Sequence, residues 1–490
     1  MKTNEKKISN FLAKNVANLA SITKAWKVAL PPLEKVAYKF FVDNGDPVKV
    51  GPRRQREDKF YIASNIVRAA LKAYDNGSPA VRDRMINLFI KGFLTKSNRR
   101  KEKMKKFEEE YGTMPPSFLT ISPGGNCNLR CKDCYAASVS KGLPSLSFED
   151  VERILKEKFE KWGSWFTVIS GGEPFLWRDG DVDIIELARL HPEQYFLVYT
   201  NGTLIDKDKA KKLAEVGNIT PAISVEGFEK ETDERRGKGT YKRILSAFEN
   251  LRNAGVPFGI SVTATPENAE LLISKEMIKF YFDEQGALYE WLFQYMPIGR
   301  GVDVDHQVSP LVRAKMWERE QEIVRKERLF FADFWNGGTF SSGCIAGARP
   351  GGYLYIDWNG NIYPCVFVPF WKDNIHEINK QGKTLTDALY SDLFKGVRDW
   401  QLSYNYMCPP NTRGNEIRPC FIRDHHKVAH DLFVKTKAKP GYPSAALCLR
   451  DPDYYNRMIR YDEKLAELLD PIWEEQYLES GKKEDKKRIS

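Results

Sequence analysis

Six short apolar segments, each followed by a stretch with helical patterning, constrain the fold of this 490-residue chain more than any other feature. Strands that alternate with helices predict a parallel sheet, because each helix carries the chain back to begin the next strand in the same direction. Closed or nearly closed parallel sheets place their sites at the carboxyl ends of the strands. The six segments are residues 118–122, 166–170, 195–199, 222–225, 258–263 and 291–295.

Three cysteines follow the first segment with the spacing C-x3-C-x2-C, at Cys127, Cys131 and Cys134. A structural zinc needs four ligands, and a cubane iron–sulfur cluster normally takes four thiolates. Three thiolates on one loop therefore indicate a cluster with one iron left open. The alternative is a zinc site or a ferredoxin-like cluster that takes its fourth cysteine from elsewhere in the chain.

A glycine-rich run follows the second segment directly: Gly171, Gly172, Glu173 and Pro174. Glycines let the backbone approach a ligand closely, while carbonyl and carboxylate groups can bind an ammonium group. Taken alone, the run is equally typical of an ordinary turn. Its place at a strand end, downstream of the cysteine triplet, favours a binding role.

With these motifs, residues from about 115 to 425 resemble the radical S-adenosylmethionine (SAM) superfamily, in its maturase-like branch. The resemblance implies an α/β fold, a partial (β/α)6 barrel of parallel strands. It also implies a [4Fe-4S] cluster on the cysteine triplet, with SAM chelating the open iron and its amino group bound by residues 171–174. Reductive cleavage of SAM would give a 5′-deoxyadenosyl radical that abstracts hydrogen from an unactivated carbon.

The resemblance assigns further SAM contacts at the later strand ends. Ser224 and Arg236 would hold the carboxylate or ribose, with Arg235 as the competing arginine, and Glu226 would hold the ribose hydroxyls. The segment YTNGT, with Asn201, corresponds to a third strand end. The alternative is that these residues form a solvated, charged loop.

One position in the cysteine loop departs from the pattern of the superfamily. Many members carry an aromatic residue directly before the third cysteine, to pack on adenine, whereas this chain has Asp133 there. We expect Tyr135, one position after that cysteine, to take over the packing. The segment FQYMPIGRG, residues 293–301, resembles the sixth strand end, where adenine often packs.

A second group of cysteines lies in the last third of the chain. Cys344 precedes, and Cys365 ends, a predicted hairpin that turns at Asn359-Gly360, so the hairpin should bring these two thiols together. The region resembles the SPASM or twitch extension of peptide-modifying radical SAM enzymes, whose cysteines bind auxiliary clusters, but it lacks the tight C-x2-C-x5-C-x3-C array. We predict a second cluster, or a single iron or zinc ion, bound by Cys344, Cys365, Cys408 and Cys420, with Cys448, Asp424 and His425 as substitute ligands. Buried free cysteines are the alternative.

The ends of the chain are helical in pattern and basic. Leu12, Val16, Leu19 and Trp26 share one helical face, and Ser78-Pro79 should begin a helix that carries Val81, Met85, Leu88, Phe89 and Phe93. Another helix should begin at Asp451-Pro452, and the tail at 482–489 is lysine-rich. A basic amphipathic face can contact anionic lipid, although such a face more often packs on a domain.

Composition adds several expectations. The net charge of +10 comes without any nucleic-acid-binding motif, so we expect no nucleic-acid partner. No run of 18 apolar residues and no signal-peptide core are present, which predicts a cytoplasmic protein, with peripheral contact at the inner membrane face as an option. The predicted domains are a helical region at 1–112, the barrel at 113–335, an auxiliary-cluster domain at 336–450 and a terminal helix and tail at 451–490.

The substrate is less constrained than the chemistry. The chain resembles radical SAM proteins of anaerobes with reduced auxiliary domains, and their proposed coupling of lipid chains, with the basic helices, favours a membrane lipid as substrate. A SPASM-type peptide or protein maturase is the alternative, and an iron–sulfur electron carrier is the non-enzymatic one. A low-potential donor such as ferredoxin or flavodoxin would supply the electron. No residue is assigned a catalytic role.

Overall fold

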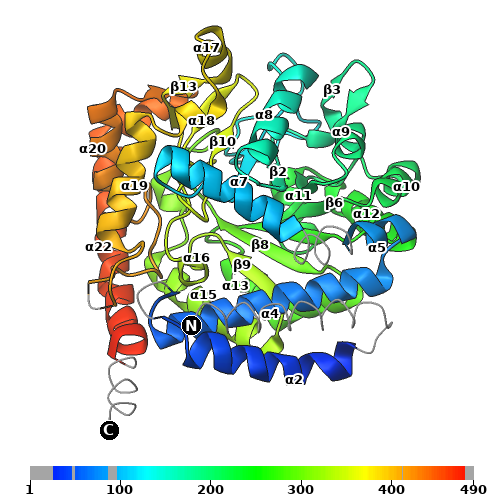
Figure 1. Ribbon diagram of the computed structural model, residues 1–490, viewed down its shortest axis with the longest axis horizontal. Coiled ribbons are helices and arrows are strands. Elements are labelled where there is room, and N and C mark those ends of the chain that lie inside the picture. The colour runs from blue at the N-terminus through cyan, green and yellow to red at the C-terminus, as the bar shows by residue number, and fades with distance from the viewer. Residues whose placement is uncertain (1–25, 47–49, 86–95, 411, 480–490) are drawn as a thin grey trace.

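A ten-stranded sheet forms the centre of the protein in a computed structural model, which describes residues 26–46, 50–85, 96–410 and 412–479 (Figure 1). The strand order is β13-β11-β10-β1-β2-β5-β6-β7-β8-β9. The six predicted segments form its middle, and each pairs in parallel with its neighbour. They are β1 (Phe118–Ile121), β2 (Phe166–Ile169), β5 (Tyr195–Thr200), β6 (Ile219–Val225), β7 (Gly259–Ala264) and β8 (Tyr289–Gln294). The predicted fold class is confirmed.

Helices cover the outer face of this sheet and bury their apolar sides against it. Ser147 caps the first of them, since its hydroxyl accepts a hydrogen bond from Asp150 N at 3.1 Å. They are α8 (Phe148–Glu160), α9 (Ile184–Leu190), α10 (Lys207–Val216), α12 (Thr240–Ala254), α13 (Ala269–Leu272), α14 (Lys275–Ile278) and α15 (Pro310–Glu322). The short charged helix α11 (Glu229–Arg236) buries only Thr232.

The C-terminal part of the chain continues the same sheet. β10 (Tyr355–Ile356) pairs in parallel with β1, and β11 (Asn361–Tyr363) pairs antiparallel with β10. Gly360 has a φ of 79°, so the predicted Asn-Gly hairpin forms there. β13 (Asp373–Asn374) completes this edge, and β9 (Phe330–Asp333) forms the other. The domain boundary proposed at residue 335 therefore falls within one continuous sheet.

Three helices of the C-terminal part lie side by side along one flank of the molecule, α19 (Asp392–Tyr404), α20 (His426–Thr436) and α22 (Pro452–Trp473) (Figure 1). The predicted start of α22 is correct, because the Asp451 carboxylate accepts a hydrogen bond from Asp453 N at 2.9 Å. Met458, Tyr461, Leu465 and Leu469 are buried on one face of this helix, while Leu468 is exposed. Short elements complete this region: α16 (Gly338–Ser341), α17 (Ile375–Lys380), α18 (Leu385–Ala388), α21 (Leu447–Arg450), β12 (Phe370–Trp371), β14 (Lys439–Pro440) and the π-helical turn η8 (Glu474–Glu479).

The N-terminal helix α4 (Arg53–Asn76) packs across the barrel. Several of its charged side chains make hydrogen bonds and ion pairs with other parts of the molecule. The buried Asp58 carboxylate accepts hydrogen bonds from Arg325 and, at 2.7 Å, from the Tyr477 hydroxyl. Lys59 Nζ donates to Ser342 Oγ at 2.7 Å. These contacts identify α4 as part of the folded core, and they leave less of its charge for a membrane surface.

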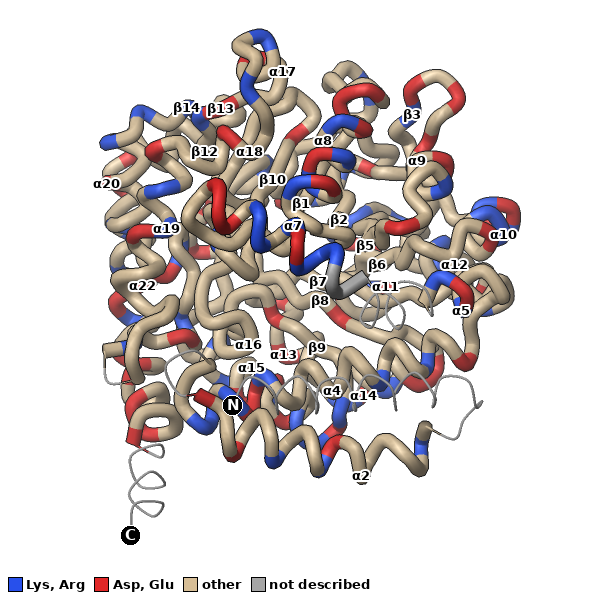
Figure 2. Tube along the Cα trace, in the orientation of Figure 1, with Lys and Arg blue, Asp and Glu red and all other residues tan. Residues whose placement is uncertain are grey.

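The other N-terminal elements are α2 (Trp26–Tyr38), η1 (Lys39–Asp43), α5 (Pro79–Met85) and α7 (Lys96–Tyr111). In Figure 2 the basic run of α7 gives way to acidic residues, Glu108–Glu110, at its carboxyl end. None of the described helices is long and apolar enough to span a membrane. Predicted features outside the described residues are Leu12, Val16, Leu19, Leu88, Phe89, Phe93 and the tail at 482–489.

Candidate functional site

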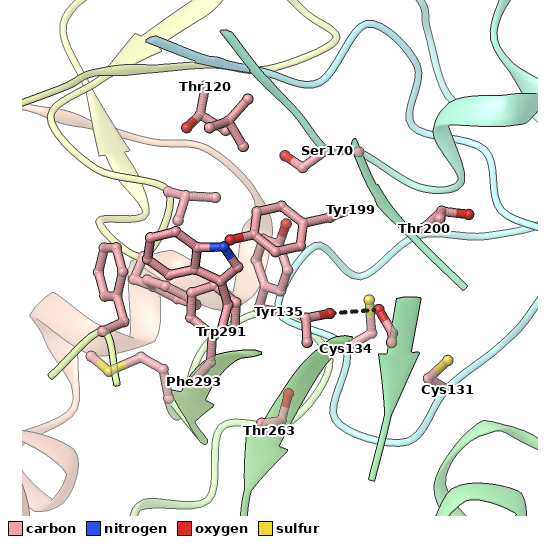
Figure 3. A pocket seen from close by; sticks show the side chains of 18 of the residues that line it. Thr120, Cys131, Cys134, Tyr135, Ser170, Tyr199, Thr200, Thr263, Trp291 and Phe293 are labelled. Carbon is pink, nitrogen blue, oxygen red and sulfur yellow. Dashed lines mark hydrogen bonds between the residues drawn. The ribbon is translucent and has the colours of Figure 1, made fainter. Parts of the chain in front are cut away.

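The cysteine triplet lies on the loop between β1 and α8, at the carboxyl end of β1. All three residues line a cavity of about 350 Å³ at the strand ends, and Cys127 is the most buried of them. Figure 3 shows the Cys131 and Cys134 sulfur atoms on one side of this cavity and the rings of Trp291 and Phe293 on another. Within the described ranges, no three His, Cys, Asp or Glu side chains are gathered tightly enough for a single metal ion.

The glycines after β2 permit a close backbone contact with the cysteine loop. Gly172 N donates to Gly124 O at 3.0 Å, and Glu173 N donates to Asn126 O at 2.8 Å. A Cβ atom on Gly172 would lie 2.1 Å from Asn126 O, a distance that excludes any other residue there. The run was predicted to approach a ligand, and the structure shows that it also holds the loop that carries the triplet.

Glu173 is buried and does not line the cavity, whereas Ser170, Gly171 and Gly172 do. Its carboxylate accepts hydrogen bonds from Thr200 Oγ1 at 2.7 Å and from Asn201 N at 2.8 Å. Burial raises the pKa of this carboxyl group, although these hydrogen bonds oppose the shift. The carboxylate thus ties the end of β2 to the end of β5, and Pro174 begins a short 3-10 turn behind it.

Asn201, at the end of β5, lies against the first cysteine. Its Nδ2 atom donates to Asn128 Oδ1 at 2.8 Å and lies 3.9 Å from Cys127 Sγ, which also accepts a hydrogen bond from Leu129 N at 3.4 Å. Burial raises the pKa of Cys127 to about 11. A thiolate at this position therefore needs a positive partner, which iron would supply.

Glu226 faces two arginines and is not among the residues that line the cavity. Its carboxylate accepts hydrogen bonds from Arg235 Nη1 at 2.6 Å, from Arg236 Nε at 2.9 Å and from Thr263 N at 3.2 Å. Burial opposes the charge of Arg236, but the Glu226 carboxylate outweighs it and raises the pKa of the guanidinium. The two arginines bind Oε1, and among the described residues Oε2 accepts only from Thr263 N, so the contact of Glu226 with ribose stays a prediction.

Arg235 and Arg236 both line the cavity, as does Ser224. Arg236 Nη1 lies 4.0 Å from Cys131 Sγ, so a positive charge stands beside the cysteine loop. Ser224 Oγ lies 3.1 Å from Ser261 Oγ on the neighbouring strand. The cavity wall therefore includes Ser224 and Arg236, the two residues predicted to hold the SAM carboxylate or ribose.

Arg300 is a loop-holding residue that the sequence reasoning missed. Its guanidinium donates to the carbonyl oxygens of Cys131 and Ser138, and its backbone N donates to Cys134 O at 3.0 Å. A Cβ atom on the neighbouring Gly299 would lie 2.2 Å from Tyr135 O. The sequence does contain a signal for this role, which is the Gly-Arg-Gly run at residues 299–301 after the sixth strand. Glycines at such a position allow two backbone segments to approach closely.

Aromatic side chains form much of the cavity wall. Tyr135 lines the cavity with its ring centroid 5.5 Å from that of Phe367, and burial raises its pKa to about 12. Asp133, beside it, has a positive φ of 55° and lies 3.5 Å from His306 Nε2. Three more rings, those of Tyr199, Trp291 and Phe293, are labelled in Figure 3. The remaining rings are those of Phe118, Phe166, Tyr295, Phe334 and Tyr353.

Three cysteines of the second group surround another cavity, of about 310 Å³. Cys344 follows α16, Cys365 follows β11, and Cys420 lies in the loop before α20. Burial raises the pKa of Cys365 and of Cys420 to about 12. The two cysteines that the hairpin was predicted to bring together line the same cavity, and Cys420 lines it as well.

The other predicted ligands are placed elsewhere. Cys408 does not line this cavity, and its thiol donates to Leu402 O at 3.2 Å, while Cys448 is buried in α21. Asp424 is ion-paired with Arg313 at 2.6 Å, and His425 Nε2 lies 3.1 Å from Arg418 O. The structure therefore brings together three of the four predicted cysteines and none of the substitutes.

The two cavities adjoin each other. Four residues line both of them: Phe118, Trp291, Phe334 and Ile345. Tyr353 also links them, because its ring lines the first cavity while its hydroxyl lies 3.0 Å from Cys365 Sγ in the second. The cysteine triplet and the second group of cysteines thus face neighbouring spaces in one core.

Known proteins resemble this chain in sequence, and the match to a family model lies in the barrel region. Residues 121–272 match the family model "Radical SAM superfamily". The AdoMet-dependent heme synthase of Methanosarcina barkeri is 29% identical over 358 residues, 67% of this chain and 94% of that protein. The mycofactocin maturase MftC of Mycolicibacterium smegmatis is 28% identical over 306 residues, 60% of this chain and 75% of that protein.

Solved structures include a similar fold. Streptococcus suis SuiB bound to the precursor peptide SuiA matches with a TM-score of 0.50 and 22% identity, covering 68% of this chain and 77% of that one. The chain therefore contains a radical SAM domain and is a radical SAM enzyme, whose family uses a [4Fe-4S] cluster and SAM. Its relatives are SPASM- and twitch-type maturases and heme synthases.

Proposed function

We propose that this radical SAM enzyme modifies a peptide or protein. The observation that carries the proposal is the contact between the two cysteine-lined cavities, which share four wall residues. An auxiliary cluster next to the site of radical formation is the arrangement that the resemblance to SPASM and twitch maturases implies. Relatives named as maturases of mycofactocin, of sulfatases and of a sporulation killing factor support it.

In this proposal Cys127, Cys131 and Cys134 hold the cluster, which when reduced supplies the electron that cleaves SAM. The protein binds and orients SAM and excludes water. Gly171 and Gly172 present backbone groups to its amino end, and Arg236 presents a positive charge. Polar groups for the rest of SAM are Ser224, Ser261, Thr263 and Asn201. The apolar rings opposite keep the radical away from water and contact the substrate.

Lipid modification, the first expectation from the sequence, has less support than its peptide alternative. That expectation depended on basic N-terminal helices, and α4 uses Lys59 and Asp58 in contacts with the barrel and the C-terminal helix. The relatives include peptide maturases. A low-potential ferredoxin or flavodoxin as electron donor remains part of the proposal, and the exposed Arg130 and Lys132 beside Cys131 suit an acidic partner.

A tetrapyrrole substrate is the second candidate. The heme synthase relative is matched over 94% of its length, and one further relative is a Fe-coproporphyrin III synthase. Flat aromatic walls such as Trp291 and Phe293 could stack on a macrocycle. If a tetrapyrrole is the substrate, the radical should abstract hydrogen from the macrocycle and not from a peptide.

The test uses the full chain with reconstituted clusters, dithionite and SAM. In separate reactions it is mixed with a carbon-deuterated peptide pool, deuterated phospholipid vesicles and deuterated iron coproporphyrin. Mass spectrometry then measures deuterium in 5′-deoxyadenosine. We expect deuterium from the peptide pool. Transfer from only the vesicles or only the porphyrin would overturn the proposal in favour of that substrate, and no 5′-deoxyadenosine at all would contradict the assigned chemistry.

A further inference from the structure

We infer that the outer face of helix α2 and of the turn η1 docks on a membrane surface that carries anionic lipid. Such docking would be independent of the proposed peptide substrate, because the face contributes no residue to the wall of either cysteine-lined cavity. Six exposed side chains define this outer face: Lys27, Val28, Lys35, Val36, Lys39 and Phe41.

The opposite face of α2 attaches the helix to α4, through residues spaced four apart. Trp26 Nε1 donates to Asp75 Oδ2 at 2.8 Å, and Glu34 is paired with Arg68 at 2.6 Å. Residues four apart lie on the same side of an α-helix, so the outer face points away from α4. The attached face consists of Trp26, Leu30, Glu34 and Tyr38.

The outer face exposes several apolar side chains next to one another. Val28 is 82% exposed, Phe41 is 51% exposed and Val36 is 49% exposed. Figure 1 shows α2 at the edge of the molecule, on the side of α4 that faces away from the sheet. A single exposed apolar residue needs no explanation, but a group of them on one face marks an interaction site.

Lysines accompany these apolar residues on the outer face. The acidic side chains of α2 and η1 are paired elsewhere, Glu34 with Arg328 at 2.9 Å and Asp43 with Arg53 at 2.6 Å. These carboxylates are therefore not available to balance the charge of the lysines. Exposed apolar groups beside lysines are typical of a helix that lies in the interface of an anionic bilayer. The lysine stems can extend over the apolar region while the ammonium groups contact lipid phosphates.

The chain that leads into α2 has the same charge. Residues 1–25 contain five lysines, Lys2, Lys6, Lys7, Lys14 and Lys24, and one acidic residue, Glu5. A stable protein partner usually covers about 800 Å² on each side, whereas a bilayer can receive the face of a single helix. A 13-residue helix followed by a five-residue turn, with basic chain before it, fits the bilayer better.

The test measures how the full-length, reconstituted enzyme floats with lipid vesicles. Vesicles of phosphatidylcholine alone are compared with vesicles in which half of the lipid is phosphatidylglycerol. One variant combines Lys27→Glu, Lys35→Glu and Lys39→Glu, and a second combines Val28→Ser, Val36→Ser and Phe41→Ser. The matched control combines Lys101→Glu, Lys105→Glu and Lys106→Glu on α7, which changes the net charge equally at another set of exposed lysines.

We expect the parent to bind the anionic vesicles and not the neutral ones. Both α2 variants should bind the anionic vesicles more than about tenfold more weakly, and the α7 control should bind nearly as well as the parent. Unchanged binding in either α2 variant would overturn the inference, and so would an equal loss in the α7 control. A parent that binds neither kind of vesicle, or both kinds equally, would overturn it as well.

Other occupants of the outer face predict different results. If a second copy of the chain covers it, sedimentation without vesicles will show a dimer that the Val28→Ser combination dissociates. If residues 1–24 alone attach the enzyme, their deletion will abolish vesicle binding while the α2 lysine variant keeps it. Either result would overturn the inference. Circular dichroism identifies a variant that fails to fold, and Lys→Gln then replaces Lys→Glu. No peptide is present, so vesicle binding and the peptide assay succeed or fail separately.

Discussion

The two cysteine sites of this enzyme are built in opposite ways. The first takes its three thiols from one eight-residue loop, which the neighbouring strand ends hold from several sides through Gly172, Arg235 and Arg300. The second takes one thiol from each of three distant segments and buries them among apolar side chains. A site whose residues lie on one loop can be predicted from the spacing of those residues in the sequence. A site assembled from distant segments can be predicted only when the whole fold is known.

The two sites also differ in their electrostatics. Arg236 places a positive charge 4.0 Å from Cys131 Sγ, beside a partly exposed loop. At the second site the Arg349 guanidinium donates to Cys344 O at 2.6 Å, and two further cations, Arg313 and Arg423, are paired with the buried Asp424. Both sites therefore place an arginine beside a cysteine, but the first lies on a partly exposed loop while Cys365 of the second is buried.

The largest expected difference comes from removing one thiol at each site. Cys131→Ser should abolish SAM cleavage, lowering 5′-deoxyadenosine formation by more than about 1000-fold, because the reaction begins at that cluster. Cys365→Ser should leave uncoupled SAM cleavage within about tenfold of the parent while it stops substrate modification. Chromatography of 5′-deoxyadenosine and product measures both. Equal loss of SAM cleavage in the two variants would contradict the division of roles.

Breaking the buried ion pair beneath the second site should have the next largest effect. Asp424→Asn leaves Arg313 charged and without its partner, at a cost of about 3–5 kcal/mol in unfolding free energy. Arg313 holds the pKa of Asp424 well below its usual range, although burial alone would raise it. Denaturant unfolding measures the cost.

The matched control for that variant is Asp431→Asn, which breaks the exposed pair with Lys427 on α20. It should leave the unfolding free energy nearly unchanged. Iron bound at the second site should fall in Asp424→Asn and not in Asp431→Asn. A small stability change in Asp424→Asn would show that the network below Cys420 does not hold the distributed site together.

A methyl group at Gly172 should damage the first site and spare the second. The added Cβ would lie 2.1 Å from Asn126 O, so the cysteine loop must move, at a cost of about 2–3 kcal/mol. We expect Gly172→Ala to lose iron from the first cluster and to weaken SAM binding. Gly180→Ala is the control for a purely local backbone cost, because a Cβ there meets nothing within 4 Å and only the left-handed φ of 57° opposes it. Retention of full SAM affinity by Gly172→Ala would argue against a loop-holding role for this glycine.

The smallest effect should come from Tyr353→Phe. Removing the hydroxyl that lies 3.0 Å from Cys365 Sγ takes away a hydrogen bond to a cluster ligand, at a cost to stability of about 1 kcal/mol. The second cluster should become harder to reduce, because such hydrogen bonds stabilise the reduced form. A redox titration followed by electron paramagnetic resonance measures this shift. An unchanged midpoint potential would mean that the hydroxyl does not act on the cluster.

Sequence patterns predicted correctly those structural features that depend on residues close together in the chain. The six strands, the Asn359-Gly360 hairpin and the start of α22 follow from apolar runs, a turn dipeptide and a capping aspartate. The family model and the sheet agree with the class predicted from the cysteine triplet and residues 171–174. In each case the determining contacts lie within a few residues.

The failures have one physical cause, which is that side-chain partners come from distant segments. Cys408 was assigned to the second site, but its loop is anchored elsewhere. The pairing of the Glu226 carboxylate with two arginines of the next helix was not predicted. Nor was the burial of Asp58 in α4, whose partners are Arg325 and Tyr477. Sequence spacing carries no information about such partners.

The position of α4 has a consequence for how the protein is made. Asp58 is satisfied by Arg325 and by the hydroxyl of Tyr477, which lies near the end of the last described helix. A buried carboxylate without such partners is costly, so this early helix cannot reach its final place until residue 477 has been synthesised. Because α4 also contacts the segment just before Cys344, through Lys59 and Ser342, the second group of cysteines should reach its final arrangement only after residue 477 has left the ribosome.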